Sequence, residues 1–111
     1  MSKTALLFAG QGAQVVGMGK DLAENYPSVR AWFDRANAAL GYDLTSVCFR
    51  GPDSELTKTE NAQPGIFLVS WVALQLLLDR VPALKFGATA GLSLGEFTAL
   101  TAAGALSFED G

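Results

Sequence analysis

The sequence has no histidine and a single cysteine, Cys48, among its 111 residues. Histidine is the side chain that most often activates a serine near neutral pH, so no serine–histidine pair can form within these residues. One cysteine excludes an intrachain disulfide and a cluster of cysteine ligands, and we expect no metal site. We expect Cys48 itself to be a small buried apolar residue.

Charged residues are few, and basic residues are fewer than acidic ones. The chain has eight lysines and arginines and eleven acidic residues, which gives a net charge of −3. The basic residues are scattered along the chain, so we do not expect a nucleic-acid partner. Half of the residues are hydrophobic. This composition fits an α/β interior, or a part of a larger protein with a face that is normally covered.

No apolar run in the sequence is long enough to cross a membrane comfortably. The longest one, residues 66–78, contains Ser70 and Gln75 and is shorter than the roughly 20 residues that cross a bilayer comfortably. We interpret it as a buried helix. The first apolar run is soon interrupted by Gly10 and Gln11, so no signal peptide is evident. We therefore expect a cytoplasmic chain with no membrane partner.

The most informative stretch is a G-x-S-x-G motif at residues 91–95, centred on Ser93. An apolar run at 86–90 predicts a buried strand before it, and residues 96–103 predict a helix after it. In such a strand–turn–helix, a nucleophile elbow, the serine hydroxyl is pushed out at the sheet edge and the glycines let the backbone pass closely. The amide of Leu94 would then start the helix, where it could donate to an oxyanion.

The same residues allow a second interpretation. Ser93 and Glu96 have the spacing of a capping box, in which the serine only caps a helix. Similar patterns occur at residues 57–60 and 107–110. The spacing alone leaves both interpretations open, but the flanking glycines and the apolar run favour a nucleophile.

A second glycine-rich loop, residues 10–19, follows an apolar run at 4–8 that predicts a buried strand of a parallel sheet. A dinucleotide fingerprint would need glycine where Val15 stands, and a P-loop would need lysine where Met18 stands. Both phosphate-binding motifs are therefore excluded. What remains is a loop whose amides can approach a ligand closely, or an ordinary flexible connector.

The remaining pattern is mainly helical. Trp32 and Phe33 belong to an apolar helical stripe and are expected in the core. Only two strands are predicted, and two parallel strands do not form a stable sheet. We therefore expect residues 1–111 to be the N-terminal part of a larger α/β protein. Helices are predicted at residues 20–26, 27–40, 43–50 and 54–58. A long buried helix is predicted to begin at residues 61–64, with Pro64 in its first turn, and to end at 79–82. Residues 108–111 resemble the start of a further helix.

These motifs together carry a resemblance to a known family. Residues 8–14, FAGQGAQ, resemble the F-P-G-Q-G-S-Q loop near the start of malonyl-CoA:acyl carrier protein transacylases. The family also includes the acyltransferase domains of polyketide and fatty-acid synthases, but the start at Met1 directly before the first strand favours the free-standing bacterial enzyme. Further matches follow in the family's order at residues 17–19, 41–44, 51–52, 57–64 and 91–96.

The resemblance implies the fold and the extent of the domain. It implies the N-terminal part of an α/β-hydrolase-like parallel sheet with flanking helices, incomplete in this chain. Residues 1–111 would form the first part of the acyltransferase catalytic domain. The second half, a ferredoxin-like subdomain, the catalytic histidine and the arginine that binds the malonyl carboxylate would lie beyond them.

The resemblance also implies a role for several residues. Ser93 would be the nucleophile, and the backbone amides of Gln11 and Leu94 would form the oxyanion hole. Gln63 matches a glutamine that the family places near the site. Leu92 stands where the family most often has a histidine. That histidine is not the catalytic base, so the chemistry would survive the change.

The activity implied is a two-step transfer in fatty acid biosynthesis. Ser93 would take malonyl from coenzyme A and pass it to the phosphopantetheine thiol of acyl carrier protein. Malonyl-CoA and acyl carrier protein would be the partners, and no cofactor would be needed because the coenzyme A thioester is a substrate. We expect the 111 residues alone to be inactive. Two alternatives remain open: a serine hydrolase of the α/β class, and a non-catalytic fragment that uses Ser93 as a helix cap.

Overall fold

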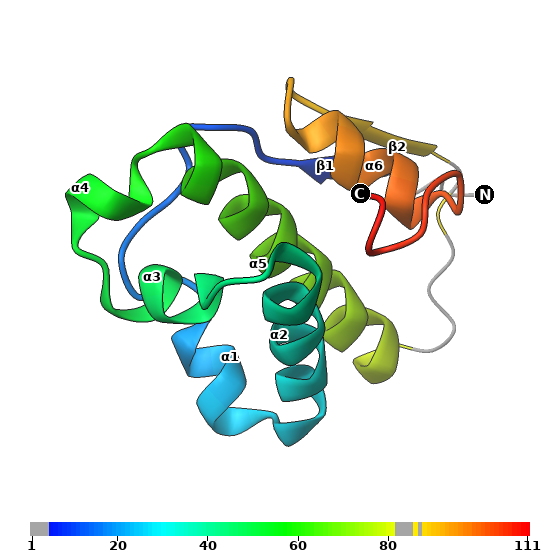
Figure 1. The fold of residues 1–111 in the computed structure, drawn as a ribbon. Coiled ribbons are helices and arrows are strands. Elements are labelled where there is room, and N and C mark those ends of the chain that lie inside the picture. Colours follow the sequence, from blue (N-terminus) through cyan, green and yellow to red (C-terminus); the bar gives the residue numbers. More distant parts are fainter. Residues whose placement is uncertain (1–4, 82–85, 87) are drawn as a thin grey trace.

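The computed structural model describes residues 5–81, 86 and 88–111. Two groups of elements lie side by side (Figure 1). One is a cluster of helices made by the first two thirds of the chain. The other is a small sheet with one helix and a C-terminal turn. Residues 4, 82 and 87, which belong to predicted elements, lie outside the described residues.

Within the described residues, the sheet consists of two parallel strands, β1 (Ala5–Phe8) and β2 (Ala88–Gly91). Ala5 pairs with Ala88 and Phe8 with Gly91. Helix α6 (Gly95–Ala102) packs against both strands. Exposed and half-buried residues alternate along each strand, and Leu7 is 80% exposed. The prediction of buried strands is therefore wrong here, because no further layer covers the sheet in the described part of the chain.

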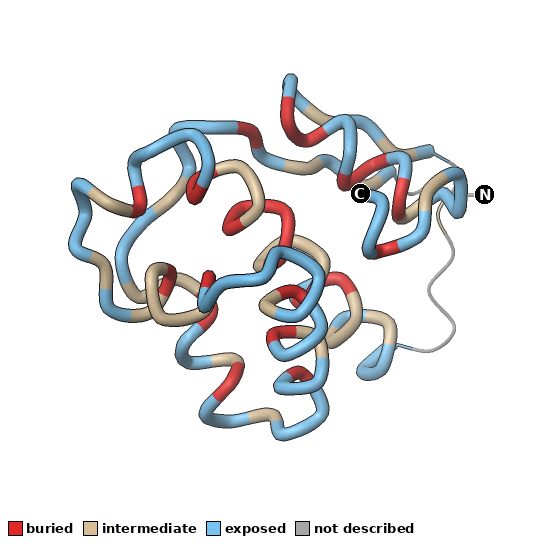
Figure 2. Tube along the Cα trace, in the orientation of Figure 1, coloured by how far each residue is buried: buried red, intermediate tan, exposed pale blue. Residues whose placement is uncertain are grey.

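The core lies among the helices α1 (Lys20–Asn25), α2 (Pro27–Leu40), α3 (Leu44–Arg50), α4 (Asp53–Leu56) and α5 (Thr59–Arg80). Figure 2 shows the buried residues gathered on the sides of these helices that face one another. The predicted stripe on α2 is confirmed at both of its aromatic residues, since Phe33 is buried and Trp32 packs against the core. Leu40, the last residue of α2, is exposed. One cluster of buried core residues consists of Ala23, Val29, Phe33, Ala36, Leu44, Cys48, Leu56, Phe67, Leu68, Val72 and Phe108.

Local signals set several helix ends as predicted. Pro27 is the first residue of α2, where its missing N–H costs nothing, and Gly41 ends the helix with a φ of 79°. At the start of α3, the Asp43 carboxylate accepts a hydrogen bond from the amide of Ser46 at 3.1 Å. Bonds to the Ser46 hydroxyl and amide lower the pKa of Asp43. The turn at residues 43–46 is therefore stabilised by its own side chains.

The start of α5 differs from the prediction. The helix begins at Thr59, so Pro64 lies inside it and not in its first turn. A proline at this position leaves the carbonyl of Glu60, four residues earlier, without its helical donor. The hydroxyl of Tyr42 donates to that carbonyl at 3.0 Å. A tertiary contact thus replaces the lost helical bond and allows the helix to begin earlier.

Helix α5 is 22 residues long, which is longer than the apolar run found in the sequence. By length and composition alone it is the one helix of the described residues that could cross a membrane. It contacts α2, α3, α4 and α6. Of its most apolar window, 44% is buried inside the protein. These contacts identify α5 as the central helix of the unit, although Leu77 remains exposed.

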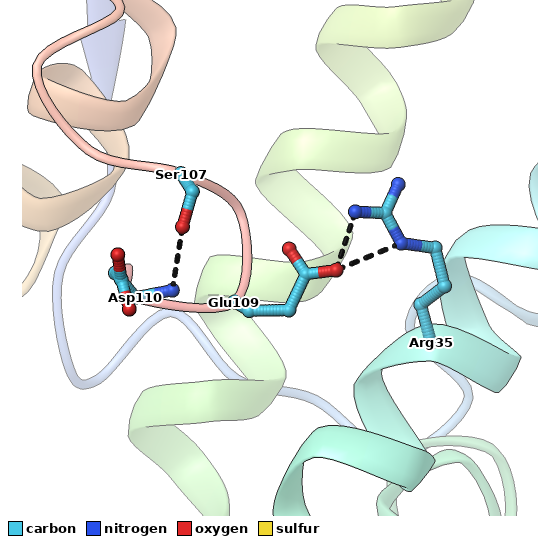
Figure 3. A network of polar contacts seen from close by, with 4 residues as sticks. All are labelled: Arg35, Ser107, Glu109 and Asp110. Carbon is cyan, nitrogen blue, oxygen red and sulfur yellow. Dashed lines mark hydrogen bonds and ion pairs between the residues drawn. The ribbon is translucent and has the colours of Figure 1, made fainter.

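The C-terminal residues form a turn with helical character. The amide of Gly111 donates to the carbonyl of Ser107 at 2.9 Å, and the amide of Asp110 donates to the Ser107 hydroxyl at 3.2 Å (Figure 3). The second bond is that of a helix N-cap. The structure has a turn here and no helix, so the predicted helix start is present only as these first bonds.

An ion pair fastens this turn to α2. The Nε of Arg35 donates to the Glu109 carboxylate at 3.1 Å (Figure 3). The guanidinium also lies over the rings of Trp32 and Phe108, 4.5 and 5.2 Å from their centroids. The hydrogen bond from Arg35 lowers the pKa of Glu109. Charge and aromatic contacts together thus hold the C-terminal turn on the helical cluster.

Candidate functional site

The turn between β2 and α6 has a strained backbone at Ser93. Its φ is 53°, and it is the one non-glycine residue with a positive φ in the described part of the chain. This left-handed conformation costs an L-residue roughly 1–2 kcal/mol. The side chain is exposed. Strain of this kind at an exposed polar residue points to a functional constraint.

Close backbone contacts explain why glycine stands at positions 91 and 95 of the motif. A Cβ on Gly91 would lie 1.9 Å from the carbonyl carbon of Gly95, and a Cβ on Gly95 would lie 2.3 Å from the carbonyl oxygen of Phe8. Gly10, in the first loop, would meet the carbonyl oxygen of Leu92 at 2.3 Å. Real Cβ atoms do not come this close to backbone. Only glycine therefore lets the two loops and the strand ends pack together here.

The Ser93 side chain does not cap α6. The amide of Glu96, which a capping box would bond to the serine hydroxyl, donates to the Ser93 carbonyl at 3.0 Å. Within the described residues, the Ser93 hydroxyl makes no hydrogen bond, and neither do the backbone amides of Leu94 and Gln11. Leu94 is buried at 7% exposure. A hydroxyl and two amides at these loops are thus left without a partner in the described residues.

The first glycine-rich loop is held in place. The amide of Gly12, at a φ of 110°, donates to the side-chain oxygen of Gln14 at 2.8 Å. The amide of Gly17 donates to the carbonyl of Cys48 at 2.8 Å. Gly10 is packed against the elbow, as described above. These contacts argue against an ordinary flexible connector.

Two predicted site residues meet through their side chains. Gln63 Nε2 donates to Gln11 Oε1 at 3.4 Å. Gln11 Nε2 in turn donates to Thr59 Oγ1 at 3.1 Å. Sequence reasoning missed Thr59. The spacing of Thr59 and Gln63 places both on one face of α5, but no local signal links that face to Gln11.

A cavity of about 360 Å³ lies between α2, α5, α6 and the C-terminal turn. Gln63 and Leu94 both line it, whereas Ser93 and Gln11 do not. The wall is mostly apolar, with Glu109 and Asp110 on one side. The structure therefore bonds the Gln63 side chain to that of Gln11, places Gln63 and Leu94 on the wall of one cavity, and leaves Ser93 exposed on the turn beside Leu94.

Other candidate chemistry is limited. Cys48 is fully buried as predicted, and burial raises the pKa of its thiol from 9.0 to about 11, so it stays protonated near neutral pH. No group of three metal-ligating side chains occurs in the residues that the structure describes. Leu92, beside the serine, is 77% exposed, and its apolar side chain cannot supply the hydrogen bond of a histidine.

Comparisons with known proteins point to one family. The sequence profile described as "Acyl transferase domain" matches residues 5–111. The malonyl CoA-acyl carrier protein transacylase of Bacillus subtilis (strain 168) is 48% identical over 110 residues, which cover 99% of this chain and 34% of the relative. The chain thus spans about a third of the length of the curated relatives it matches.

Solved structures show the same fold. The acyl-carrier-protein S-malonyltransferase of Burkholderia pseudomallei 1710b superposes with a TM-score of 0.90 at 38% identity, over 98% of this chain and 35% of that one. A malonyl-transacylase solved in complex with its type II PKS acyl-carrier protein gives a TM-score of 0.86 at 39% identity, over 97% of this chain and 35% of that one. The predicted fold class, an incomplete α/β sheet with flanking helices, is confirmed.

Proposed function

Because this chain belongs to the acyl transferase domain family, we propose that it carries the nucleophile of a malonyl transfer from coenzyme A to acyl carrier protein in fatty acid biosynthesis. The observation that carries the proposal is the strained backbone of Ser93, with a φ of 53° on a turn between strand and helix. A nucleophile elbow needs this conformation to present its hydroxyl at the sheet edge. The names of the relatives supply the acyl group and the acceptor.

In the proposed first step, Ser93 Oγ attacks the thioester carbonyl of malonyl-CoA. The carbon–sulfur bond breaks, coenzyme A leaves as the thiol with the serine proton, and a malonyl-serine ester remains. In the second step the carrier thiol attacks this ester, and Ser93 recovers its proton. A base must move the proton in each step. The chain has no histidine, and the family resemblance places that base beyond residue 111.

The backbone amides of Gln11 and Leu94 are proposed to stabilise the negative charge on the carbonyl oxygen. Neither amide has a hydrogen-bond partner among the described residues, and Leu94 precedes the first turn of α6, at the positive end of the helix dipole. The contact of Gly10 with Leu92 brings the two loops together. Each such donor contributes about 10²–10³ in rate.

The reaction as proposed needs no cofactor, because the thioester itself supplies the activated acyl group. Matches to an acyl transferase profile and to transacylases favour transfer over the hydrolase alternative. We propose a cytoplasmic location, because the charged phosphates of a coenzyme A substrate keep that substrate from crossing a membrane unaided. The proposed protein partner is the acyl carrier protein of fatty acid synthesis.

The test is the intact mass of the whole protein before and after brief incubation with malonyl-CoA, followed by peptide mapping. We expect one malonyl adduct on Ser93, which acyl carrier protein then removes. Ser93→Ala should abolish the adduct, and Ser54→Ala, at another exposed serine, should keep it. An adduct that persists in Ser93→Ala would refute the assignment. Release of free malonate with no transfer to the carrier would support a hydrolase.

A further inference from the structure

The side chain of Gln11 is held at both ends by α5. Its Nε2 donates to Thr59 Oγ1 at 3.1 Å, and its Oε1 accepts from Gln63 Nε2 at 3.4 Å. Thr59 and Gln63 are four residues apart, so they lie on one face of the helix, one turn apart. Both polar ends of the Gln11 side chain are thus tied to a single rigid element, α5.

The loop around Gln11 needs such a tie. Gln11 lies between Gly10 and Gly12, and Gly12 has a φ of 110°. Glycines allow many backbone conformations, so the chain on its own does not fix the direction of the Gln11 amide. Gly10 lies so close to the Leu92 carbonyl that an added Cβ would clash with it. The Gln11 side chain, bonded to Thr59 and Gln63, supplies the second fixed point.

We propose that Thr59 is a positioning residue for the oxyanion hole. Its hydroxyl holds the Gln11 side chain and thereby keeps the Gln11 backbone amide directed toward the Ser93 turn. The inference rests on the proposed function, because it assigns the Gln11 amide to the oxyanion. Thr59 acts only through Gln11. An amide that is already oriented saves the cost of reorganisation when charge develops in the transition state.

A substitution can remove this tie and leave the helix intact. Thr59 is the first residue of α5, and in the described residues the hydrogen bond of its hydroxyl is the one from Gln11 Nε2. Thr59→Val removes the hydroxyl and keeps the branched shape. Thr59→Ser keeps the hydroxyl. Thr57 is exposed and has no side-chain hydrogen bond in the described residues, so Thr57→Val is the same chemical change two residues away and serves as the control.

The experiment uses the whole protein and follows malonylation of Ser93 and transfer to acyl carrier protein. We expect Thr59→Val to lower kcat about three- to tenfold, which corresponds to the loss of one hydrogen bond between neutral groups. KM should change little, because the oxyanion contact forms in the transition state. Thr59→Ser should restore the rate, and Thr57→Val should match the parent protein.

The second readout is the NMR signal of the Gln11 side-chain amide, which reports on the tie without any need for activity. It should shift in Thr59→Val and return in Thr59→Ser. A Thr59→Val protein with a shifted signal and an unchanged kcat would overturn the positioning role. An unshifted signal would overturn the tie itself. A parent protein that is never malonylated on Ser93 would refute the proposed function, and the inference with it, whatever the NMR signal does.

Discussion

The strain at Ser93 can be measured by comparing two substitutions, Ser93→Gly and Ser93→Ala. The side chain is exposed and makes no hydrogen bond in the described residues, so neither change opens a cavity or breaks a side-chain contact seen there. Both remove the proposed nucleophile and should abolish malonyl transfer. The two variants differ only in the backbone, since alanine keeps a Cβ at a φ of 53° and glycine does not.

The magnitude follows from two opposing backbone effects. Glycine escapes the left-handed penalty of roughly 1–2 kcal/mol, but it loses about 0.4–1 kcal/mol because its unfolded chain is more flexible. We therefore expect Ser93→Gly to be about 0.5–1 kcal/mol more stable than Ser93→Ala.

The assay is chemical and thermal unfolding of the two purified variants, followed by circular dichroism in the same buffer. Activity plays no part in it, so the result bears on the backbone alone. An alanine variant as stable as the glycine variant, or more stable, would refute the reasoning. The serine would then occupy an unstrained conformation, and the main structural support for a nucleophile elbow would be lost.

Two further predictions follow from the packing around the site. Gly95→Ala should destabilise the protein by about 3 kcal/mol or more, because the new Cβ would meet the backbone carbonyl oxygen of Phe8 at 2.3 Å. Urea unfolding measures the change, and a loss of unfolding free energy under about 0.5 kcal/mol would contradict the close approach. Arg35→Met should destabilise the protein most above the normal pKa of a carboxylate. The hydrogen bond from Arg35 lowers the pKa of Glu109 in the folded state, so this contribution is present above the unfolded pKa and disappears as the pH falls through the lowered one. Unfolding measured on both proteins from neutral to acidic pH should therefore show a stability difference that narrows, although the loss of the Arg35 contacts with Trp32 and Phe108 persists at every pH. A difference that stays constant would show that the ion pair contributes nothing.

Much of the fold was predictable because its signals are local. Pro27 and Gly41 mark the ends of α2, and Asp43 caps α3 with its own carboxylate. Helix ends and turns depend on the backbone needs of a few neighbouring residues, and those needs are met by residue types at fixed spacings. The elbow is of the same kind, and Ser93 has the strained conformation that the motif predicts.

The wrong predictions concern features that depend on distant residues. The apolar strands were expected to be buried, but burial requires covering layers that the described residues do not provide. Helix α5 begins earlier than its sequence predicts, because the hydroxyl of Tyr42 donates to the carbonyl that Pro64 leaves free. No pattern within α5 announces that partner.

The family, the fold class and the residue types of the proposed site follow from the amino-acid sequence, because local backbone geometry requires the glycines beside Gln11 and Ser93. How these residues are held depends on the packed fold. It brought Gly10 against Leu92 and tied Gln11 to Thr59 and Gln63. These contacts join segments far apart in the chain, and their geometry exists only once the helices and strands have packed.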